Sequence, residues 1–514
     1  LSAMSIESGH SPAARAAHIP LLLIAVLQGL ALYALHTAVT AGRWPATDMA
    51  WLLPLYGLAL LLPLTAQLLA AHLRQRLTWA LLAGVALVVA LAGWQAGAHE
   101  VRDRIDLRML SIAHAGLPLL LLWCIAVPFL RLRLAQGRWW PDYAALFSTT
   151  WRTLLGLAEA LAFTGLFWVL LMLWQTLFAM LGIDFFRDLF MRPVFAYPVT
   201  AIVFGAALYL VGSIDRLVDA VLAQVLGVLQ WLLPLAALIL MLFTLALLPR
   251  LPALLANAQR PLSAVLMLWL VALTVLLLNA AWRDGRQAPG WWPWLLQGLR
   301  AVPLLLALVA ATALYALVLR IADLGLTVSR YWGLVVALGT LAYALSYSVA
   351  ALRRGPWLAG LGTANRVIAL ALAGVLALSV SPLLSPQRLA AESQLARARA
   401  ATDARSLEGP LQALARRRQG PLPAARAPAL RPPAALQEAL RADFDAAALE
   451  KGPALPRQPV GFWADVDGDG RQDLVIVPGR YEGVRVYRAT DQGWVGDELK
   501  HSLPAGSLPG PAAQ

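Results

Sequence analysis

Long apolar runs, each close to the length of a bilayer crossing, dominate the first three quarters of this 514-residue chain. A helix needs ~20 predominantly apolar residues to cross the hydrocarbon core. Eleven runs approach or exceed that length: Ile19–Val39, Trp51–Ala70, Leu77–Gln95, Met109–Leu130, Thr153–Leu181, Phe195–Gly212, Gly227–Leu248, Leu262–Ala281, Ala301–Leu319, Gly333–Leu352 and Val367–Leu384. The pattern predicts an all-α polytopic membrane bundle of about eleven transmembrane helices over residues 19–384, preceded by a polar N-terminal tail, residues 1–18.

The pattern changes after Leu384, where Ser385-Pro386 breaks the last apolar run. Residues 385–457 alternate Ala- and Arg-rich pieces with Pro-rich breaks, which predicts a helical linker. Residues 458–500 contain short β-branched and aromatic runs such as Leu474–Val477, which predict a small β-rich domain. Residues 501–514 are small, Pro-rich and predicted to be disordered. The bundle is therefore expected to carry a small mixed α/β extramembrane C-terminal tail.

One segment between two spans has an amphipathic period. Apolar side chains recur at helical spacing from Ile214 to Val225, while Asp215, Arg216 and Asp219 fall on the opposite face. Such a helix is expected to lie in the plane of the membrane interface. Tryptophans in the polar connections, including Trp139 and Trp140, are typical of the depth of the lipid headgroups.

Composition agrees with a membrane protein: 60% of the residues are hydrophobic and 13% are charged, against ~25% charged in soluble domains. The formal net charge is +13, and most of the excess lies in the loops of residues 1–384. Basic loops near a bilayer favour membrane lipids with anionic headgroups as partners. No basic patch interleaved with aromatic residues indicates nucleic-acid binding.

The distribution of arginine predicts an orientation. The alternate loops that begin with the N-terminal tail hold fourteen Arg, and the other loops hold ten. By the positive-inside tendency, the N-terminus is expected to be cytoplasmic. With eleven spans in a bacterial inner membrane, the C-terminal tail is then periplasmic.

An aspartate-rich loop stands in the predicted β-rich domain, at Asp465-Val466-Asp467-Gly468-Asp469-Gly470-Arg471-Gln472-Asp473. Carboxylates at the first, third, fifth and ninth positions, with glycine at the sixth, suit a calcium ion, which takes six to eight oxygen ligands. The predicted ligands are the side chains of Asp465, Asp467, Asp469 and Asp473 and the carbonyl of Arg471. Ile476 replaces the bidentate Glu of a helix-loop-helix site, so an ordinary Asp-Gly turn remains the alternative.

Polar side chains inside the spans are few. Glu159 follows Arg152 by two helical turns, and an intramembrane carboxylate is a functional hypothesis unless it snorkels or pairs with an Arg. His114 lies early in the fourth span, where a single hydrogen bond to a neutral imidazole is the alternative to a functional role. Asn279 and Asn365 are isolated and suited to interhelical hydrogen bonds.

The turn between the ninth and tenth spans carries recognisable residues. Gly325 is expected to end one helix, Thr327 to cap the next, and Arg320 to pair with Asp323. The stretch from Arg320 to Arg330, RIADLGLTVSR, resembles the R-[IV]-A-x-x-G-L-T-x-x-R turn of domain-of-unknown-function family 4153. Further similarities are Asn279-Ala280-Ala281-Trp282 with Asp284-Gly285, Ile183-Asp184-Phe185-Phe186, and Ser381-Pro382-Leu383-Leu384 with Ser393-Gln394-Leu395-Ala396-Arg397.

That resemblance implies a multi-pass inner-membrane protein without an assigned activity. The aspartate-rich loop separately resembles the calcium loop of integrin-type and VCBS-like repeats, which form propeller blades in arrays. The sequence contains one copy of this loop, so a propeller is excluded and a single metal-stabilised hairpin is the expectation.

Three classes of function stay open. A membrane-anchored sensor or interaction protein would use the C-terminal tail, and this is the leading hypothesis. A transporter or lipid-handling protein would use the bundle and a polar site around Glu159. An enzyme would need clustered acids and bases, for which the loop Glu100–Asp106 is the densest stretch, and the sequence holds no H-E-x-x-H, P-loop or G-x-S-x-G motif.

Overall fold

The structure is a computed structural model of the chain. It describes residues 12–98, 105–213, 215–252, 263–285, 289–353, 357–400, 460–464, 471, 473–477, 485–490 and 493–498. Among these residues, 11 helices are long and apolar enough to cross a membrane. The predicted polytopic helical bundle is therefore confirmed.

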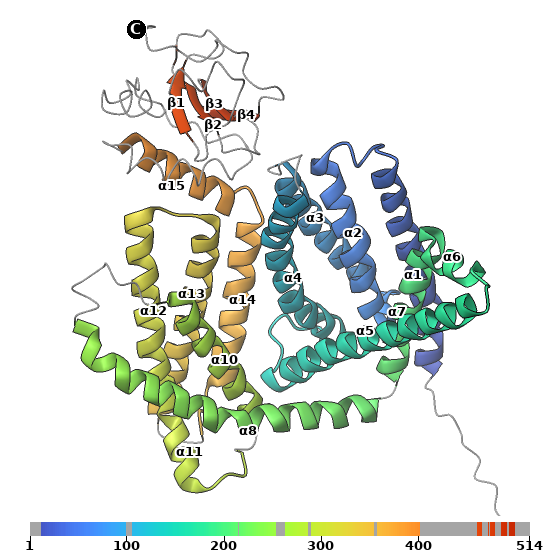
Figure 1. Ribbon diagram of the computed structural model, residues 1–514. Coiled ribbons are helices and arrows are strands. Elements are labelled where there is room, and N and C mark those ends of the chain that lie inside the picture. Colours follow the sequence, from blue (N-terminus) through green and yellow to red (C-terminus); the bar gives the residue numbers. More distant parts are fainter. Residues whose placement is uncertain are drawn as a thin grey trace, which may run out of the picture.

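The first half of the bundle is built from closely packed helix pairs (Figure 1). Its elements are α1 (Pro12–Thr40), α2 (Met49–Leu68), the 3-10 helix η1 (Ala70–His72), α3 (Arg76–Ala98), α4 (Ile105–Gln136), α5 (Tyr143–Met180), α6 (Phe185–Met191) and α7 (Pro193–Ser213). Gly93 of α3 lies so close to α2 that a Cβ there would be 2.6 Å from Pro54 Cα. Small residues permit such close approach where apolar burial cannot drive helices together.

The second half contains the largest cluster of buried side chains in the described chain. Its elements are α8 (Asp215–Leu247), the 3-10 helix η2 (Leu248–Arg250), α10 (Ala264–Trp282), α11 (Pro293–Arg300), α12 (Val302–Leu324), α13 (Val328–Leu352) and α14 (Leu361–Ser379). Leu278 of α10, Leu306 of α12 and Tyr347 of α13 are fully buried at its centre. The largest buried core of the described chain thus lies among α10, α12, α13 and α14.

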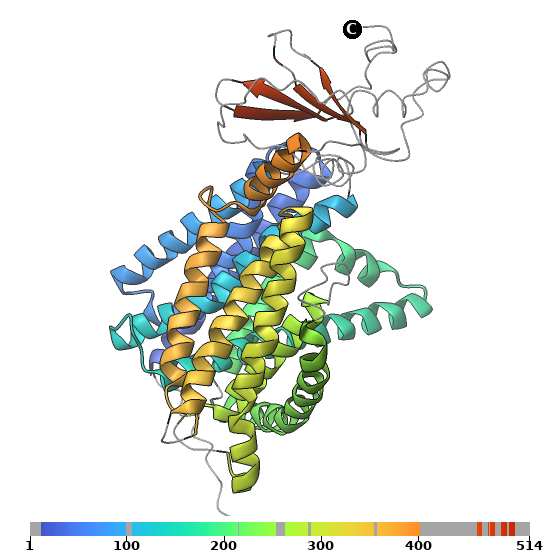
Figure 2. The ribbon, with the colours of Figure 1, turned by 90° about the vertical axis from the view of Figure 1, so that its left-hand side faces the viewer.

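The helix α8 differs from the prediction. The sequence predicted an interfacial helix up to Val225 and a separate span from Gly227, but α8 is one helix of 33 residues. Glycine inside a helix costs only about 1 kcal/mol relative to alanine, and the apolar positions continue through Gly227. α8 crosses α10 and α12 at a large angle in Figure 1, and Figure 2 shows it nearly along its axis.

The outer surface of the spans is apolar. On α5, Leu161, Leu166 and Val169 are 63%, 58% and 62% exposed. A continuous apolar exterior of this kind is unfavourable in water and favourable against lipid tails. The described helices are therefore matched to a hydrocarbon environment.

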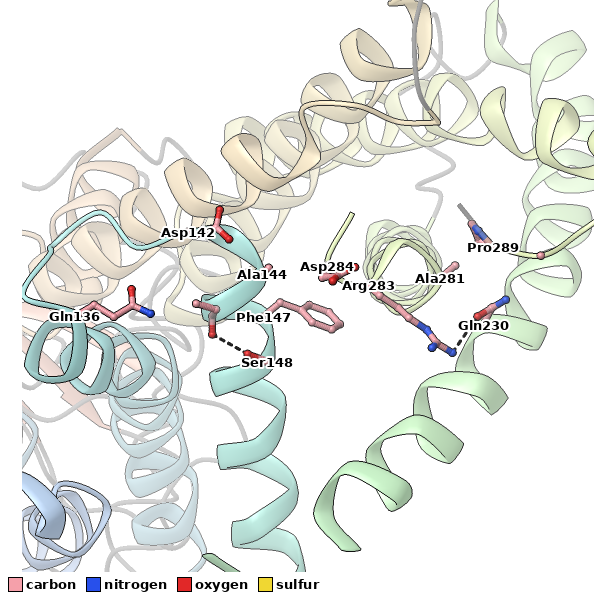
Figure 3. Close-up of a pocket in the computed structure, with 12 residues that line it drawn as sticks. Gln136, Asp142, Ala144, Phe147, Ser148, Gln230, Ala281, Arg283, Asp284 and Pro289 are labelled. Carbon is pink, nitrogen blue, oxygen red and sulfur yellow. Dashed lines mark hydrogen bonds between the residues drawn. The ribbon is translucent and has the colours of Figure 1, made fainter. Parts of the chain in front are cut away.

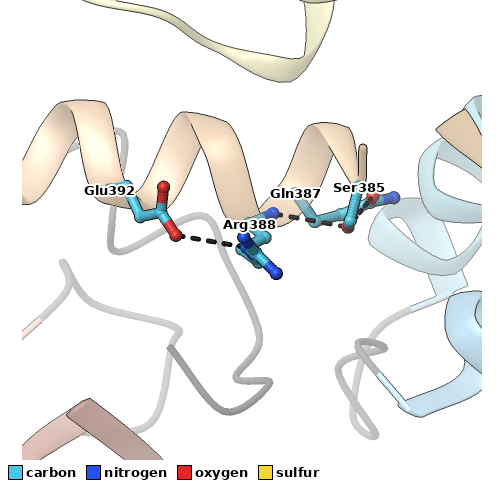
Figure 4. Close-up of polar contacts among 4 residues, drawn as sticks. All are labelled: Ser385, Gln387, Arg388 and Glu392. Atoms are coloured by element: carbon cyan, nitrogen blue, oxygen red, sulfur yellow. Dashed lines mark hydrogen bonds and ion pairs between the residues drawn. The ribbon is translucent and has the colours of Figure 1, made fainter. Parts of the chain in front are cut away.

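A short helix, α15 (Pro386–Ala400), follows the last span. Ser385 precedes it and accepts a hydrogen bond from the Arg388 backbone N–H at 3.4 Å, while Pro386 occupies the first helical position (Figure 4). Arg388 Nε lies 3.2 Å from Glu392 Oε1, four residues on. Both side chains of this ion pair are over a third exposed, so it contributes little to stability.

Four strands lie near the C-terminus: β1 (Val460–Ala464), β2 (Asp473–Val477), β3 (Arg485–Thr490) and β4 (Gly493–Glu498). They pair antiparallel in the order β1-β2-β3-β4. Ala464 is paired with Asp473, so the aspartate-rich loop connects β1 to β2.

Candidate functional site

Four uncharged polar side chains from four helices meet inside the bundle: Tyr143 of α5, Asn279 of α10, Tyr347 of α13 and Asn365 of α14. We call them the Asn–Tyr cluster. Asn365 Nδ2 lies 2.6 Å from Asn279 Oδ1 and 3.0 Å from the Tyr143 hydroxyl oxygen. The interhelical role expected of Asn279 and Asn365 is thus observed, while Tyr143 and Tyr347 were not singled out in the sequence.

The cluster satisfies its own hydrogen-bonding groups. Asn279 Nδ2 donates to the Tyr347 hydroxyl at 2.7 Å and to the Val275 carbonyl at 2.8 Å. The Tyr347 hydroxyl donates to Asn365 Oδ1 at 2.6 Å, and the Tyr143 hydroxyl donates to Asn279 Oδ1 at 3.5 Å. A closed and neutral network avoids the cost of unpaired polar groups in a dry environment.

An apolar pocket of about 600 Å³ reaches the cluster from one side. It lies between four helices. Its wall includes Leu117 of α4, Ala272 of α10, Val336 of α13 and Leu376 of α14. Asn279 also lines it, as does Trp332. The indole N–H of Trp332 is buried and has no hydrogen-bond partner among the described residues. Such an unpaired donor is costly unless a bound acceptor satisfies it.

A polar hollow of about 1050 Å³ lies on the other side of the cluster, where α4 and α10 end and α5 begins. Asp142, Arg283 and Asp284 give it charges of both signs, and Gln230 of α8 forms part of its wall. Figure 3 shows the Arg283 side chain directed at Gln230, with Nη2 3.3 Å from Gln230 Oε1. Asp284 lies close enough to Tyr143 to act on it electrostatically. The hollow therefore suits a charged or strongly polar group.

The residues from Asn279 to Gly285 organise this region. Trp282 is buried and donates from Nε1 to the Trp357 carbonyl at 3.3 Å, which fixes the end of α10. Arg283 then adopts a φ of 54°, a left-handed value that is uncommon for a non-glycine residue. Gly285 packs directly on the Trp282 ring, where a Cβ would clash. This turn directs Arg283 and Asp284 into the hollow.

The pocket and the hollow are thus separated by one turn of α10 and by Tyr143. Asn279 lines the pocket, whereas Ala281 and Arg283 line the hollow. Ala281 and Arg283 follow Asn279 by two and four residues, which is about 3 and 6 Å along the helix axis at 1.5 Å per residue. Tyr143 lies between Asp142 and Ala144, which both line the hollow, and its hydroxyl contacts Asn279.

Glu159 lines neither the pocket nor the hollow. It is half-buried on α5, and within the described part of the chain it has no hydrogen-bond or ion-pair partner. Its predicted interior role stays a prediction. His114 falls within α4, but its side chain lies outside the described part of the structure.

The turn from Arg320 to Arg330 has the caps that the sequence predicted. Gly325 ends α12 with a φ of 70°, and Thr327 Oγ1 accepts from the Arg330 N–H at 3.3 Å. Arg320 and Asp323 are both exposed, and the described contacts contain no ion pair between them. Arg330 instead donates to the Gly325 carbonyl at 2.6 Å.

The helix α15 closes this turn. Ser393 Oγ accepts from the Leu326 N–H at 2.9 Å, and Gln394 Nε2 donates to the carbonyls of Leu324 and Leu326 at 3.2 and 2.9 Å. The backbone groups that a helix end leaves unpaired are therefore satisfied by side chains from a later segment.

The aspartate-rich loop is only partly described. Asp465, Asp467 and Asp469 lie outside the described residues, Asp473 begins β2, and Arg471 is exposed. Among the described residues, no group of three or more His, Cys, Asp and Glu side chains is placed to hold a metal ion. Calcium binding by this loop stays a prediction.

Comparison with known proteins gives one family match. The model of the family described as "Domain of unknown function (DUF4153)" matches residues 22–418, from the first span to beyond α15. No curated protein and no solved structure matches the chain.

Proposed function

Because the chain belongs to the family DUF4153, whose description assigns no activity, we propose a function from the geometry of its bundle: the protein binds the hydrocarbon chain of a membrane lipid in the apolar pocket. The observation that carries this proposal is a pocket of about 600 Å³ between α4, α10, α13 and α14 that ends at Asn279. Its volume is within the roughly 300–1,000 Å³ of small-molecule sites.

The surroundings of the pocket favour a lipid chain as the occupant. Leu117 and Leu121 at its rim are 57% and 48% exposed on the outside of α4. In a bilayer, the molecules that contact this surface are lipid tails. A lipid acyl chain that enters the pocket here leaves one apolar environment for another. The shape of the pocket and a few polar contacts therefore decide how well the lipid binds.

Two polar features give the occupant an orientation. The unpaired indole N–H of Trp332 can donate to an ester or carboxyl oxygen, and the amide of Asn279 lies at the Asn–Tyr cluster. Beyond the cluster, the hollow with Arg283 and Asp284 can hold a charged group. The proposed role of the cluster is to keep the apolar pocket separate from this polar hollow, as a lipid-handling protein requires.

The experiment fills the pocket. A Cβ at Gly339, which lines the pocket, meets no atom within 4 Å, so Gly339→Phe places a ring in open space. We expect this variant to lose labelling of α10 and α13 by a phospholipid with a photoactivatable acyl chain. Gly374→Phe is the matched control, because a Cβ at Gly374 of α14 also meets open space and this residue does not line the pocket. Equal labelling of both variants refutes the proposal.

Trp332→Phe tests the polar contact separately. It keeps an aromatic ring in the wall and removes the unpaired N–H. We expect weaker labelling by an ester-linked phospholipid than in the wild type, and no change in labelling by an alkane probe that has no acceptor. The same loss for both probes would assign the effect to packing.

We also propose that the β1–β2 loop binds calcium. The support is the pairing of Ala464 with Asp473, which brings together the two ends of the segment that holds the predicted ligands Asp465, Asp467, Asp469, Asp473 and the Arg471 carbonyl. Millimolar calcium is expected to slow proteolysis of the tail in the full-length protein relative to chelator, and Asp467→Ala is expected to remove the difference. Proteolysis at one rate in all conditions leaves the loop as an ordinary turn.

The proposed orientation in a bacterial inner membrane is a cytoplasmic N-terminus and a periplasmic tail. The support is the excess of arginine in the loops on the N-terminal side, together with 11 helices long enough to span. Phosphatase and fluorescent-protein fusions at Gln514 provide the test. A fluorescent fusion with an inactive phosphatase would reverse the orientation.

A further inference from the structure

A cationic side chain that lines neither the pocket nor the hollow lies inside the first half of the bundle. Arg131 belongs to the span Gly116–Gln136 and is half-buried. It precedes the end of α4 by five residues, which is about 7.5 Å along the helix axis. A charged residue at this depth is costly and is retained where it faces a partner.

The guanidinium is held inward by α5. Arg131 Nη1 donates to Thr153 Oγ1 at 2.6 Å, and Thr153 in turn donates to the Thr149 carbonyl at 2.6 Å. Thr153 is buried, so this bond orients the guanidinium between α4 and α5. A guanidinium has five N–H donors, and among the described residues no carboxylate pairs with Arg131. Most of its donors therefore have no protein acceptor in this part of the chain.

One other arginine and one histidine lie near Arg131. Arg152 lies close enough for the two guanidinium charges to repel each other, although Arg152 is itself paired with Asp219 at 2.7 Å. His72, in η1, also lies close to Arg131. Burial lowers the pKa of His72 below its ordinary value, and the Arg131 charge lowers that pKa further. Arg131 therefore supplies a positive charge between α4, α5 and η1, and no carboxylate of the described chain pairs with it.

We infer that Arg131, held by Thr153 beside His72, binds the phosphate group of an anionic phospholipid at this end of the bundle. A phosphate offers several oxygens to the remaining N–H donors, and Arg recognises phosphate with two parallel hydrogen bonds. Trp79, in the first turn of α3, and Trp139, between α4 and α5, are 62% and 56% exposed. Exposed indole rings near span ends are typical of headgroup depth. This site is separate from the proposed chain-binding pocket.

A lipid headgroup and free phosphate share this chemistry, and the experiment distinguishes them. Thermal unfolding of the delipidated full-length protein in detergent is measured with phosphatidylglycerol, with phosphatidylcholine and with inorganic phosphate. We expect phosphatidylglycerol alone to raise the midpoint. Stabilisation by inorganic phosphate equal to that by phosphatidylglycerol would replace the lipid with a soluble anion, and equal stabilisation by phosphatidylcholine would overturn the anion site.

Substitutions assign the effect to Arg131. For Arg131→Gln we expect about tenfold more phosphatidylglycerol at half-maximal stabilisation, the effect of losing a charged hydrogen bond. Arg138→Gln is the matched control, because Arg138 is exposed just beyond the same helix. An equal lipid response in Arg131→Gln and Arg138→Gln refutes the inference.

A second pair of variants covers the case in which Arg131→Gln does not fold. Thr153→Val removes the bond that holds the guanidinium inward and keeps the charge, so it is expected to weaken the lipid response. Arg131→Lys keeps the charge and loses the planar fork, and it is expected to respond more weakly than the wild type. Unchanged responses in both variants would also refute the inference.

Discussion

Replacing Asn365 by leucine is the most direct test of the Asn–Tyr cluster. The Asn365 side chain makes three interhelical hydrogen bonds, with Asn279, Tyr143 and Tyr347 at 2.6, 3.0 and 2.6 Å. Interhelical hydrogen bonds in membranes contribute about 0.6 kcal/mol each on average, so their loss amounts to about 2 kcal/mol. Leucine is similar in size, which limits any contribution from a cavity.

The partners that remain add to this cost. The hydroxyl of Tyr347, which is fully buried, and Asn279 Oδ1 would each lose their closest partner. An unsatisfied buried polar group costs about 1–3 kcal/mol. We therefore expect Asn365→Leu to lower the free energy of unfolding by about 3–5 kcal/mol, measured by tryptophan fluorescence in mixed micelles of increasing denaturing-detergent content.

A double-mutant cycle separates the network from the individual residues. Tyr347→Phe removes the hydroxyl that donates to Asn365 and accepts from Asn279. Because both substitutions break the same bond, their combined effect should be smaller than the sum by about 1 kcal/mol. Thr312→Val is the control, since among the described residues the Thr312 hydroxyl bonds only to the Leu308 carbonyl of its own helix. If Asn365→Leu lowers the free energy of unfolding by less than about 0.5 kcal/mol, the idea that the cluster stabilises the packing of the four helices is refuted.

Three other substitutions test separate features. Gly325→Ala is expected to cost about 1–2 kcal/mol of stability, because φ is 70° and the new Cβ would lie 2.6 Å from Arg397 Cδ; a wild-type melting temperature contradicts this. Gly93→Leu should separate α3 from α2 at Pro54 and lower the yield of monodisperse protein in size-exclusion chromatography. Glu159→Gln tests the predicted interior role of that carboxylate, and wild-type expression and stability would remove Glu159 from consideration.

The membrane-spanning helices could be predicted from the sequence because each one is specified by its own residues. Length and hydropathy of a single run decide whether it can cross a bilayer. Helix ends were predicted less well: α5 begins at Tyr143, ten residues before the predicted start at Thr153, and α8 continues through Gly227. Polar residues at a helix end are compatible with the helix, so apolar patterning alone does not mark the boundary.

The candidate site could be predicted only in part. Asn279 and Asn365 were conspicuous because a carboxamide is unusual inside an apolar span. Tyr143 and Tyr347 were not conspicuous, since tyrosine is amphipathic and common near interfaces. Tyr143 and Asn365 are 222 positions apart in the chain and meet only after α5 and α14 have packed. The cluster is therefore a product of tertiary structure, and periodicity within one helix contains no signal for it.

Two motifs that the sequence presents separately turn out to be one contact. The Leu324-Gly325-Leu326 turn leaves backbone groups unpaired, and Ser393 and Gln394 of α15 satisfy them. Gly325 has both the left-handed φ and the absence of a Cβ that this approach requires. Because a helix beyond the last span completes a turn between two earlier spans, displacement of α15 would remove the partners of the Leu326 N–H and carbonyl between α12 and α13. The first residues after the spans therefore contribute to the structure of the bundle itself.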